Sequence, residues 1–321
     1  MRVHWAVGLG VAAAASGVDV LRSVGEPGRS GVRHLAVADG ELAERVAHWG
    51  RLAAATYQRF EEWEACEACQ HPDISGTEVA ATWSTAVSAF SRGFVGVDHR
   101  RRQVAVVFRG TTHVMDVVTD VQAALVPWPE DGALVHAGFL RAYQAARPAV
   151  AAALDAAQQN ASLAGYSLHF VGHSLGGAQA TLAYVDYQRQ QQQAHQHSKR
   201  FPAHRQLVSF GSPQVGNRRF AQLLAAPRAS SGVAEDGVLR VVHEADIVPH
   251  LPGALLMNYA HGGREIWARD TDGAEAARLT VCQLTDDGHA DPACSASVSP
   301  LRWSIIDHMV YPGMRLGIPQ F

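Results

Sequence analysis

The stretch that decides the fold is Phe170-Val171-Gly172-His173-Ser174-Leu175-Gly176-Gly177. It contains Gly-x-Ser-x-Gly between a strand-like apolar run at 166–171 and a helix-like run at 178–187. A nucleophile elbow has this context, because a sharp strand-to-helix turn strains the serine backbone and lifts its hydroxyl clear of the sheet. The alternative is an ordinary glycine-rich turn after a buried strand. The flanking runs favour the elbow, so Ser174 is the predicted nucleophile.

The rest of the chain alternates strand-like and helix-like segments. Apolar runs predict strands at 102–108, 206–210, 238–242, 260–269 and 279–284, and helical spacing predicts helices at 41–60, 139–159 and 218–224. Such alternation favours an α/β fold with a mostly parallel central sheet and helices on both faces. The polar run at 188–200 breaks the pattern. Its His195-x-His197 lacks a third metal ligand nearby, so we interpret the run as a solvated insertion and predict no metal or other cofactor.

Composition narrows the function classes. The chain has 321 residues, 47% of them hydrophobic, and a formal net charge of −3 without a basic stripe. It therefore has no sequence feature of nucleic-acid binding. Residues 1–17 resemble a signal peptide, with an ordinary N-terminal helix as the alternative, and 18–40 are expected to form a mobile lead-in. We expect one domain at 41–321, no transmembrane segment and secretion.

Four cysteines fit an exported protein: Cys66, Cys69, Cys282 and Cys294. Three pairings are possible, and joining sequence neighbours closes two short loops. Cys66-x-x-Cys69 also has the spacing of a redox motif, but a polar helical run precedes it instead of a strand, so we favour a structural disulfide. Asn160-Ala161-Ser162 is a glycosylation sequon in a predicted loop, which adds mild support for secretion.

A serine nucleophile needs a histidine to accept its proton and a carboxylate to orient that histidine. In α/β-hydrolases the chain order is serine, acid, histidine. Asp246 follows the predicted strand at 238–242, and His308 lies near the C-terminus with an apolar flank. His289 and His250 are the weaker candidates for the base. For the oxyanion hole, the N–H of Leu175 follows the nucleophile, and a second donor is expected from the strand end at 108–112.

Together these motifs resemble one family, the class 3 lipases of the filamentous-fungal triacylglycerol type. The resemblance rests on six motifs in that family's order, FRGTT at 108–112, VHAGF at 135–139, GHSLGG at 172–177, FGSPQVGN at 210–217, DIVPHLP at 246–252 and Asp307-His308. It implies an α/β-hydrolase fold, a Ser174–Asp246–His308 triad, and Thr111 and Leu175 as the oxyanion pair. The family's short-range cysteine pattern is similar to Cys66–Cys69 and Cys282–Cys294.

The resemblance also implies a helical lid after the oxyanion residue. Val114, Val117 and Val118 share one helical face there, with Met115 beside them. Such an apolar face is expected to close over the serine in water and to contact a lipid surface when open. A secreted triacylglycerol lipase is therefore the leading hypothesis. An esterase of the same family for soluble or feruloyl-type esters is the second, and a catalytically silent lipase-like binding protein is the third.

Overall fold

The structure is a computed structural model, and it describes residues 36–37, 40–85, 91–111, 124–193, 202, 204–224, 237–253, 258–269, 278–282 and 291–316. The expected signal peptide, the expected lid segment 112–120 and His195-x-His197 lie outside these residues. Within them, no helix is long and apolar enough to cross a bilayer.

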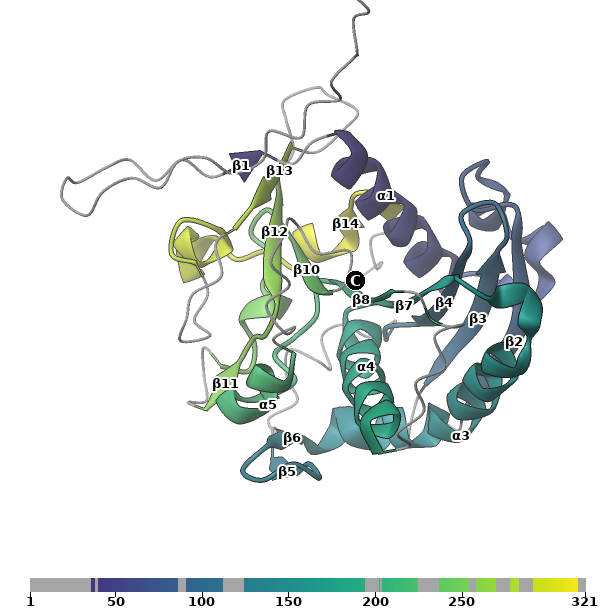
Figure 1. The fold of residues 1–321 in the computed structure, drawn as a ribbon. Helices are drawn as coiled ribbons and strands as arrows, with labels where there is room; N and C mark the ends of the chain where they lie inside the picture. Colours follow the sequence, from purple (N-terminus) through teal and green to yellow (C-terminus); the bar gives the residue numbers. More distant parts are fainter. Residues whose placement is uncertain are drawn as a thin grey trace, which may run out of the picture.

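Among the described residues, nine strands form the central sheet, in the order β1-β13-β12-β10-β8-β7-β4-β3-β2 (Figure 1). In chain order they are β1 Ala36–Val37, β2 Thr77–Ser84, β3 Arg92–Asp98, β4 Gln103–Phe108, β7 Ser167–His173, β8 Arg205–Phe210, β10 Gly237–His243, β12 Arg264–Arg269 and β13 Arg278–Val281. The five middle strands, β4, β7, β8, β10 and β12, are parallel, and both edges are antiparallel. The sheet is thus the central, mostly parallel sheet of an α/β-hydrolase.

Smaller elements complete the fold. A four-stranded sheet contains β5 Leu125–Pro127, β6 Leu134–His136, β9 Gly216–Asn217 and β11 Tyr259–Ala260, and a two-stranded one contains β14 Val310–Tyr311 and β15 Met314–Arg315. The α-helices in the described part of the chain are α1 Gly40–Ala55, α3 Ala137–Gln159, α4 Leu175–Gln193 and α5 Arg218–Leu223. Short 3-10 helices are η1 Phe60–Ala65, η2 Ala68–Gln70, η4 Ala161–Leu163, η5 Val248–His250, η6 Ser295–Ser297, η7 Pro300–Arg302 and η8 Asp307–Met309.

Several boundaries differ from the sequence prediction. The helix predicted at 41–60 ends at Ala55, and the strand predicted at 260–269 is two strands, β11 and β12. Strands β2 and β3 were not predicted, because β2 alternates as a half-exposed edge strand and two glycines interrupt the apolar run of β3. The polar run at 188–200 is helical through Gln193 and extends α4. Ala36–Val37, inside the expected lead-in, pair with β13.

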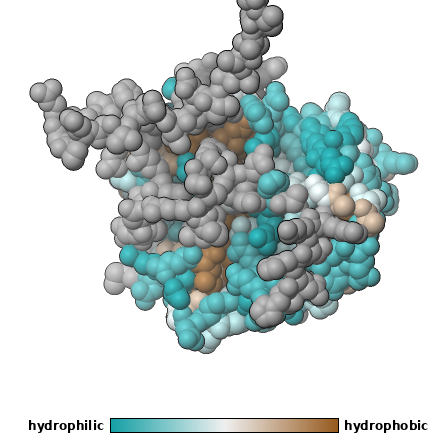
Figure 2. Space-filling model, in the orientation of Figure 1, coloured by the Kyte–Doolittle hydropathy of each residue, from teal (hydrophilic) through white to brown (hydrophobic). Residues whose placement is uncertain are grey.

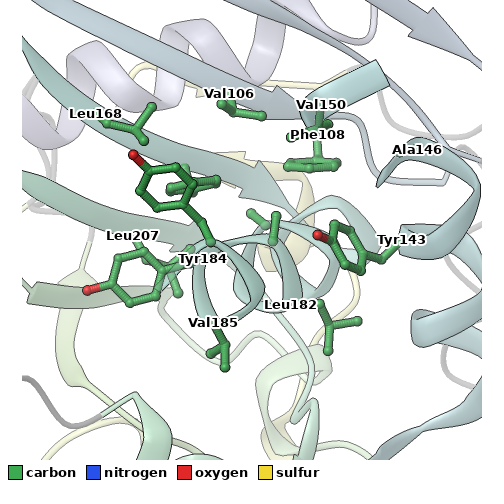
Figure 3. Close-up of a cluster of buried hydrophobic side chains, with 14 of the residues drawn as sticks. Val106, Phe108, Tyr143, Ala146, Val150, Leu168, Leu182, Tyr184, Val185 and Leu207 are labelled. Carbon is green, nitrogen blue, oxygen red and sulfur yellow. The ribbon is translucent and has the colours of Figure 1, made fainter. Parts of the chain in front are cut away.

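The sheet separates two hydrophobic cores. Alternate side chains of β4 point to opposite faces, as the pleat of a strand requires. Val104, Val106 and Phe108 pack with α3 and α4, whereas Ala105 and Val107 pack with α1. Figure 1 shows α1 and the α3–α4 pair on opposite sides of the sheet. Figure 3 shows Tyr143, Ala146 and Val150 of α3 and Leu182, Tyr184 and Val185 of α4 in the first core, together with Val106, Phe108, Leu168 and Leu207 of the strands.

The outer surface contrasts with these cores. On the face shown in Figure 2 the coloured residues are mostly hydrophilic, with hydrophobic areas near the middle of the face. Buried apolar area contributes about 25 cal/mol per Å² to folding. Because the helices bury apolar side chains on both faces of the sheet, this packing stabilises the sheet that carries the elbow.

One buried carboxylate joins the two helices on the α3 side. Asp186 of α4 accepts hydrogen bonds from the Tyr143 hydroxyl (2.7 Å), Arg147 Nε (2.6 Å) and Arg189 (2.8 Å). Burial would raise its pKa, but hydrogen bonds from Arg147, Tyr143 and Arg189 outweigh burial and lower it. Asp186 is therefore a charged anchor between α3 and α4.

We expect Asp186→Asn to lower the free energy of unfolding by about 1–3 kcal/mol at neutral pH, because charged donors lose their anionic partner. The lowered pKa means that this stabilisation is present above about pH 4, where unfolded aspartates are ionised. It is lost as pH falls through the folded-state pKa, so the difference between parent and variant should shrink in acid. Urea unfolding as a function of pH measures it. Exposed Asp155→Asn on α3 is the control, and an equal loss in the two variants would contradict the prediction.

Candidate active site

A single residue connects the strand and the helix of the elbow. β7 ends at His173 and α4 begins at Leu175, so Ser174 alone connects strand and helix. Its φ of 57° lies in the left-handed region, which costs a non-glycine residue roughly 1–3 kcal/mol. The Ser174 amide donates to the Phe210 carbonyl at the end of β8 (2.9 Å). A Cβ on Gly172 would lie 2.2 Å from the Gly176 carbonyl oxygen, so only glycine lets strand and helix approach this closely.

Asp246 lies in the loop that follows β10, and it is fully buried. Its Oδ1 accepts from the Val248 amide (2.8 Å), and its Oδ2 accepts from His308 Nδ1 (2.7 Å) and from the Tyr311 hydroxyl. A carboxylate can only accept, so His308 Nδ1 is the donor in that pair. These donors fix both oxygens of the acid and select one tautomer of the histidine.

His308 lies in η8, and its ring is also fully buried. With the hydrogen on Nδ1, Nε2 of the neutral ring is free to accept a proton. Neither His308 Nε2 nor Ser174 Oγ has a hydrogen-bond partner among the described residues, although both atoms are buried. An unpaired basic nitrogen and an unpaired hydroxyl in one buried site form the pair that nucleophilic catalysis requires, and such contacts are often loose without substrate.

The loop that carries His308 is attached to the loop of the acid. Ser304 forms an isolated parallel bridge with Asp246, and its amide donates to the Ala245 carbonyl (2.8 Å). The Ala245 amide in turn donates to the Asp307 carboxylate (3.1 Å). The acid and the base are 62 residues apart in sequence, and these contacts hold them in register.

Tyr311 was missed by the sequence reasoning. Burial and the negative charge of Asp246 raise its pKa well above the ordinary value. The phenol therefore keeps its hydrogen and donates it to the acid. The sequence signal was weak, an aromatic residue three positions after His308 in the strand β14, because nothing local shows that this strand packs beside Asp246.

The expected oxyanion residues border the nucleophile. Leu175 is the first residue of α4, where helix amides lack intrahelical acceptors. Thr111 and Gly110 follow the end of β4. A Cβ on Gly110 would lie 3.1 Å from Ser174 Cβ, so this segment lies directly against the serine. Two backbone segments thus meet beside Ser174, which is the arrangement that a developing oxyanion needs.

The remaining predictions concern the disulfides, the sequon, the weaker histidine candidates and the lid. The disulfides Cys66–Cys69 and Cys282–Cys294 are formed, with S–S distances of 2.01 and 2.02 Å. Asn160 is exposed, and its Oδ1 accepts from the Ser162 amide (3.0 Å). The ring of His250 stacks on Trp303 at 4.5 Å, and His289 lies outside the described residues. The lid residues Val114, Met115, Val117 and Val118 also lie outside them.

One group of metal-ligand types occurs among the described residues, Glu265 with Cys282 and Cys294. Both sulfurs belong to one disulfide, so neither is the thiolate that a zinc or iron site would need. The Cys282 and Ser295 amides donate to the Glu265 carbonyl and carboxylate (both 3.0 Å), so this glutamate anchors backbone. The residues here do not fit a metal centre.

Gly211 marks how tightly the acid and base are packed. Its φ is 54°, and an added Cβ would lie 2.8 Å from Asp246 Oδ2, His308 Nδ1 and the Tyr311 oxygen. We expect Gly211→Ala to lower kcat on a soluble ester by on the order of 10²-fold, because small displacements of aligned groups have effects of this size. Gly132→Ala is the matched control, since Gly132 has φ 73° but an added Cβ would make only an ordinary contact, 3.7 Å from Arg219 Cγ. Equal kcat values for the two variants would contradict the prediction.

Comparison with known proteins agrees with this geometry. Residues 105–256 match the family model described as "Lipase (class 3)". The chain is 31% identical to a lipase of Rhizomucor miehei over 285 residues, which cover 88% of this chain and 71% of that protein. It is 28% identical to the secreted mono- and diacylglycerol lipase A of Penicillium cyclopium, covering 78% of each.

A solved structure supports the same assignment. A triacylglycerol lipase whose catalytic centre is described as a serine protease triad superposes with a TM-score of 0.72 at 30% identity, covering 88% of this chain and 99% of that one. Fold, elbow and relatives therefore lead to one conclusion: the chain belongs to the class 3 lipase family of α/β-hydrolases and is a carboxylic ester hydrolase.

Proposed function

We propose that this protein is a secreted lipase that hydrolyses acylglycerols at a lipid–water interface, with Ser174 as nucleophile, His308 as base and Asp246 as acid. The observation that carries the proposal is the 2.7 Å hydrogen bond from His308 Nδ1 to Asp246 beside the strained, buried Ser174. Relatives named as secreted mono- and diacylglycerol lipases support both secretion and this substrate class.

In the proposed reaction, Ser174 Oγ attacks the ester carbonyl carbon while His308 Nε2 accepts its proton. The carbonyl oxygen becomes an anion, stabilised by donors from Leu175 and Thr111. Collapse of this intermediate breaks the ester bond, and His308 returns the proton to the departing alcohol. Water, activated by the same histidine, then hydrolyses the acyl-enzyme and releases the fatty acid. Asp246 stays ionised and stabilises the His308 imidazolium during both the formation and the hydrolysis of the acyl-enzyme.

The interfacial part of the proposal is supported by exposed apolar side chains. Leu301 is 97% and Ile306 is 55% exposed, and among the described residues they are the large hydrophobic side chains that protrude. Both lie in the segment leading to His308, Leu301 in η7 and Ile306 immediately before η8. A lipid surface would bury such side chains, each worth roughly 1.5–3 kcal/mol. The apolar face at Val114, Val117 and Val118 remains a hypothesis from the sequence that would add to this contact.

Ser174→Ala tests the nucleophile. We expect kcat to fall on the order of 10⁶-fold, because the acyl-enzyme cannot form. Circular dichroism should be unchanged, since only one buried oxygen is removed. An organophosphonate should label the parent at Ser174 and leave the variant unlabelled. Hydrolysis by the variant within tenfold of the parent would refute the assignment, and a parent without activity on any ester would favour a catalytically silent binding protein.

The double variant Leu301→Asp/Ile306→Asp tests action at the interface. Activity on emulsified triacylglycerol should fall at least about tenfold, because a charge cannot be buried unpaired against lipid. Activity on a dissolved short-chain ester should change less than twofold by the same reasoning. Ala152→Asp on the exposed face of α3 adds charge elsewhere and serves as control. Equal losses on both substrates would instead favour an esterase of soluble or feruloyl-type esters.

A further inference from the structure

The backbone of the catalytic-histidine loop has its own side-chain supports. His173 Nε2 donates to the His308 carbonyl (2.9 Å), and His243 Nδ1 donates to the Asp307 carbonyl (3.0 Å). His173 immediately precedes Ser174 and is fully buried. His173, the residue before the proposed nucleophile, therefore contacts His308, the residue proposed to accept the proton of Ser174.

The tautomer of His173 follows from its partners. A carbonyl oxygen only accepts, so Nε2 must carry the hydrogen, and in a neutral ring Nδ1 is then an acceptor. The Tyr57 hydroxyl lies 2.7 Å from Nδ1. Burial raises the pKa of Tyr57, so the phenol keeps its hydrogen and donates it to Nδ1. Each group in the series Tyr57, His173 and His308 carbonyl thus has one defined role.

Charge also favours this arrangement. Burial, and then the proximity of His308, lower the pKa of His173 well below the ordinary value, so its ring stays neutral. The two imidazole centroids are 4.5 Å apart. When His308 becomes an imidazolium during the reaction, a cationic neighbour at that distance would oppose it, whereas a neutral one does not.

Tyr57 connects this series to the oxyanion segment. The Gly110 backbone hydrogen-bonds the Tyr57 oxygen, and a Cβ on Gly110 would lie 2.2 Å from that oxygen. The Arg109 guanidinium lies over the Tyr57 ring, 5.5 Å from its centroid. Tyr57, just past the end of α1, therefore contacts both the strand end beside Thr111 and the residue before the nucleophile.

We propose that His173 is a positioning residue: its neutral ring, oriented by Tyr57, holds the His308 backbone so that His308 Nε2 meets Ser174 Oγ in the reaction. The inference rests on the proposed roles of Ser174 and His308.

His173→Asn and His173→Gln form a matched pair. The glutamine amide reaches about as far as Nε2 and retains a donor to the His308 carbonyl, whereas the asparagine amide reaches only as far as Nδ1. On a soluble ester we expect His173→Asn to lower kcat at least about tenfold with KM within about twofold, and His173→Gln to stay within about threefold of the parent. Thermal unfolding of both variants measures any loss of stability separately from the changes in kcat and KM.

Tyr57→Phe removes one oxygen and should lower kcat severalfold without changing KM. In the Tyr57→Phe/His173→Asn double variant the two effects should not add, because both act through one ring. Equal kcat for His173→Asn and His173→Gln, a loss confined to KM, or parental kcat in Tyr57→Phe would each overturn the inference. Ser174→Ala, assayed in parallel, separates the proposals: if it stays active the proposed function fails, and if only the His173 and Tyr57 variants equal the parent, this inference alone fails.

Discussion

The rest of the site depends on the turn at Ser174, where a strand becomes a helix within one residue. Strained backbone angles there are maintained by the parallel sheet on one side and by α4 on the other. The amide of Ser174 is anchored to the end of β8, so the turn cannot relax without disturbing the neighbouring strand. The left-handed conformation of Ser174 places its hydroxyl above the sheet, and the packing of the two hydrophobic cores offsets the energetic cost of this conformation.

The proposed acid and base, Asp246 and His308, are held near that turn by contacts between their two loops. The bridge between Asp246 and Ser304 joins the two loops. His173 and His243, at the ends of β7 and β10, donate to the His308 and Asp307 carbonyls and attach the His308 loop to the sheet. Asp246 is a fully buried carboxylate whose oxygens are matched by donors from Val248, His308 and Tyr311. A buried charge is tolerated only when its hydrogen bonds are made, so the same contacts that stabilise Asp246 also orient His308.

Polar groups are distributed unevenly through the interior. On the α3–α4 side the core is largely apolar around the Asp186 anchor, whereas on the α1 side His48 contacts Gln103 (2.6 Å) and Trp49 stacks on His169. A further group of histidines and tyrosines surrounds Asp246 at the carboxyl ends of the parallel strands. Three of these side chains lie on strands: His173 ends β7, His243 ends β10 and Tyr311 is in β14. Each donates a hydrogen bond to the loop of Asp246 or of His308, which we propose as catalytic residues. Rigid strands thus supply fixed points for loops that have little regular structure of their own.

The sequence by itself determined the central strands and the elbow, because strand periodicity and tight-turn glycines are local signals, whereas the catalytic roles of Ser174, Asp246 and His308 stay predictions. It did not reveal β2 and β3, whose edge exposure and glycines weaken the pattern, or the end of α1 at Ala55. Only the tertiary structure decided that Tyr311 donates to Asp246 and that Tyr57 and His173 support His308. These partners are separated by 65, 116 and 135 residues, and a hydrogen bond across such distances leaves no periodic trace in the chain.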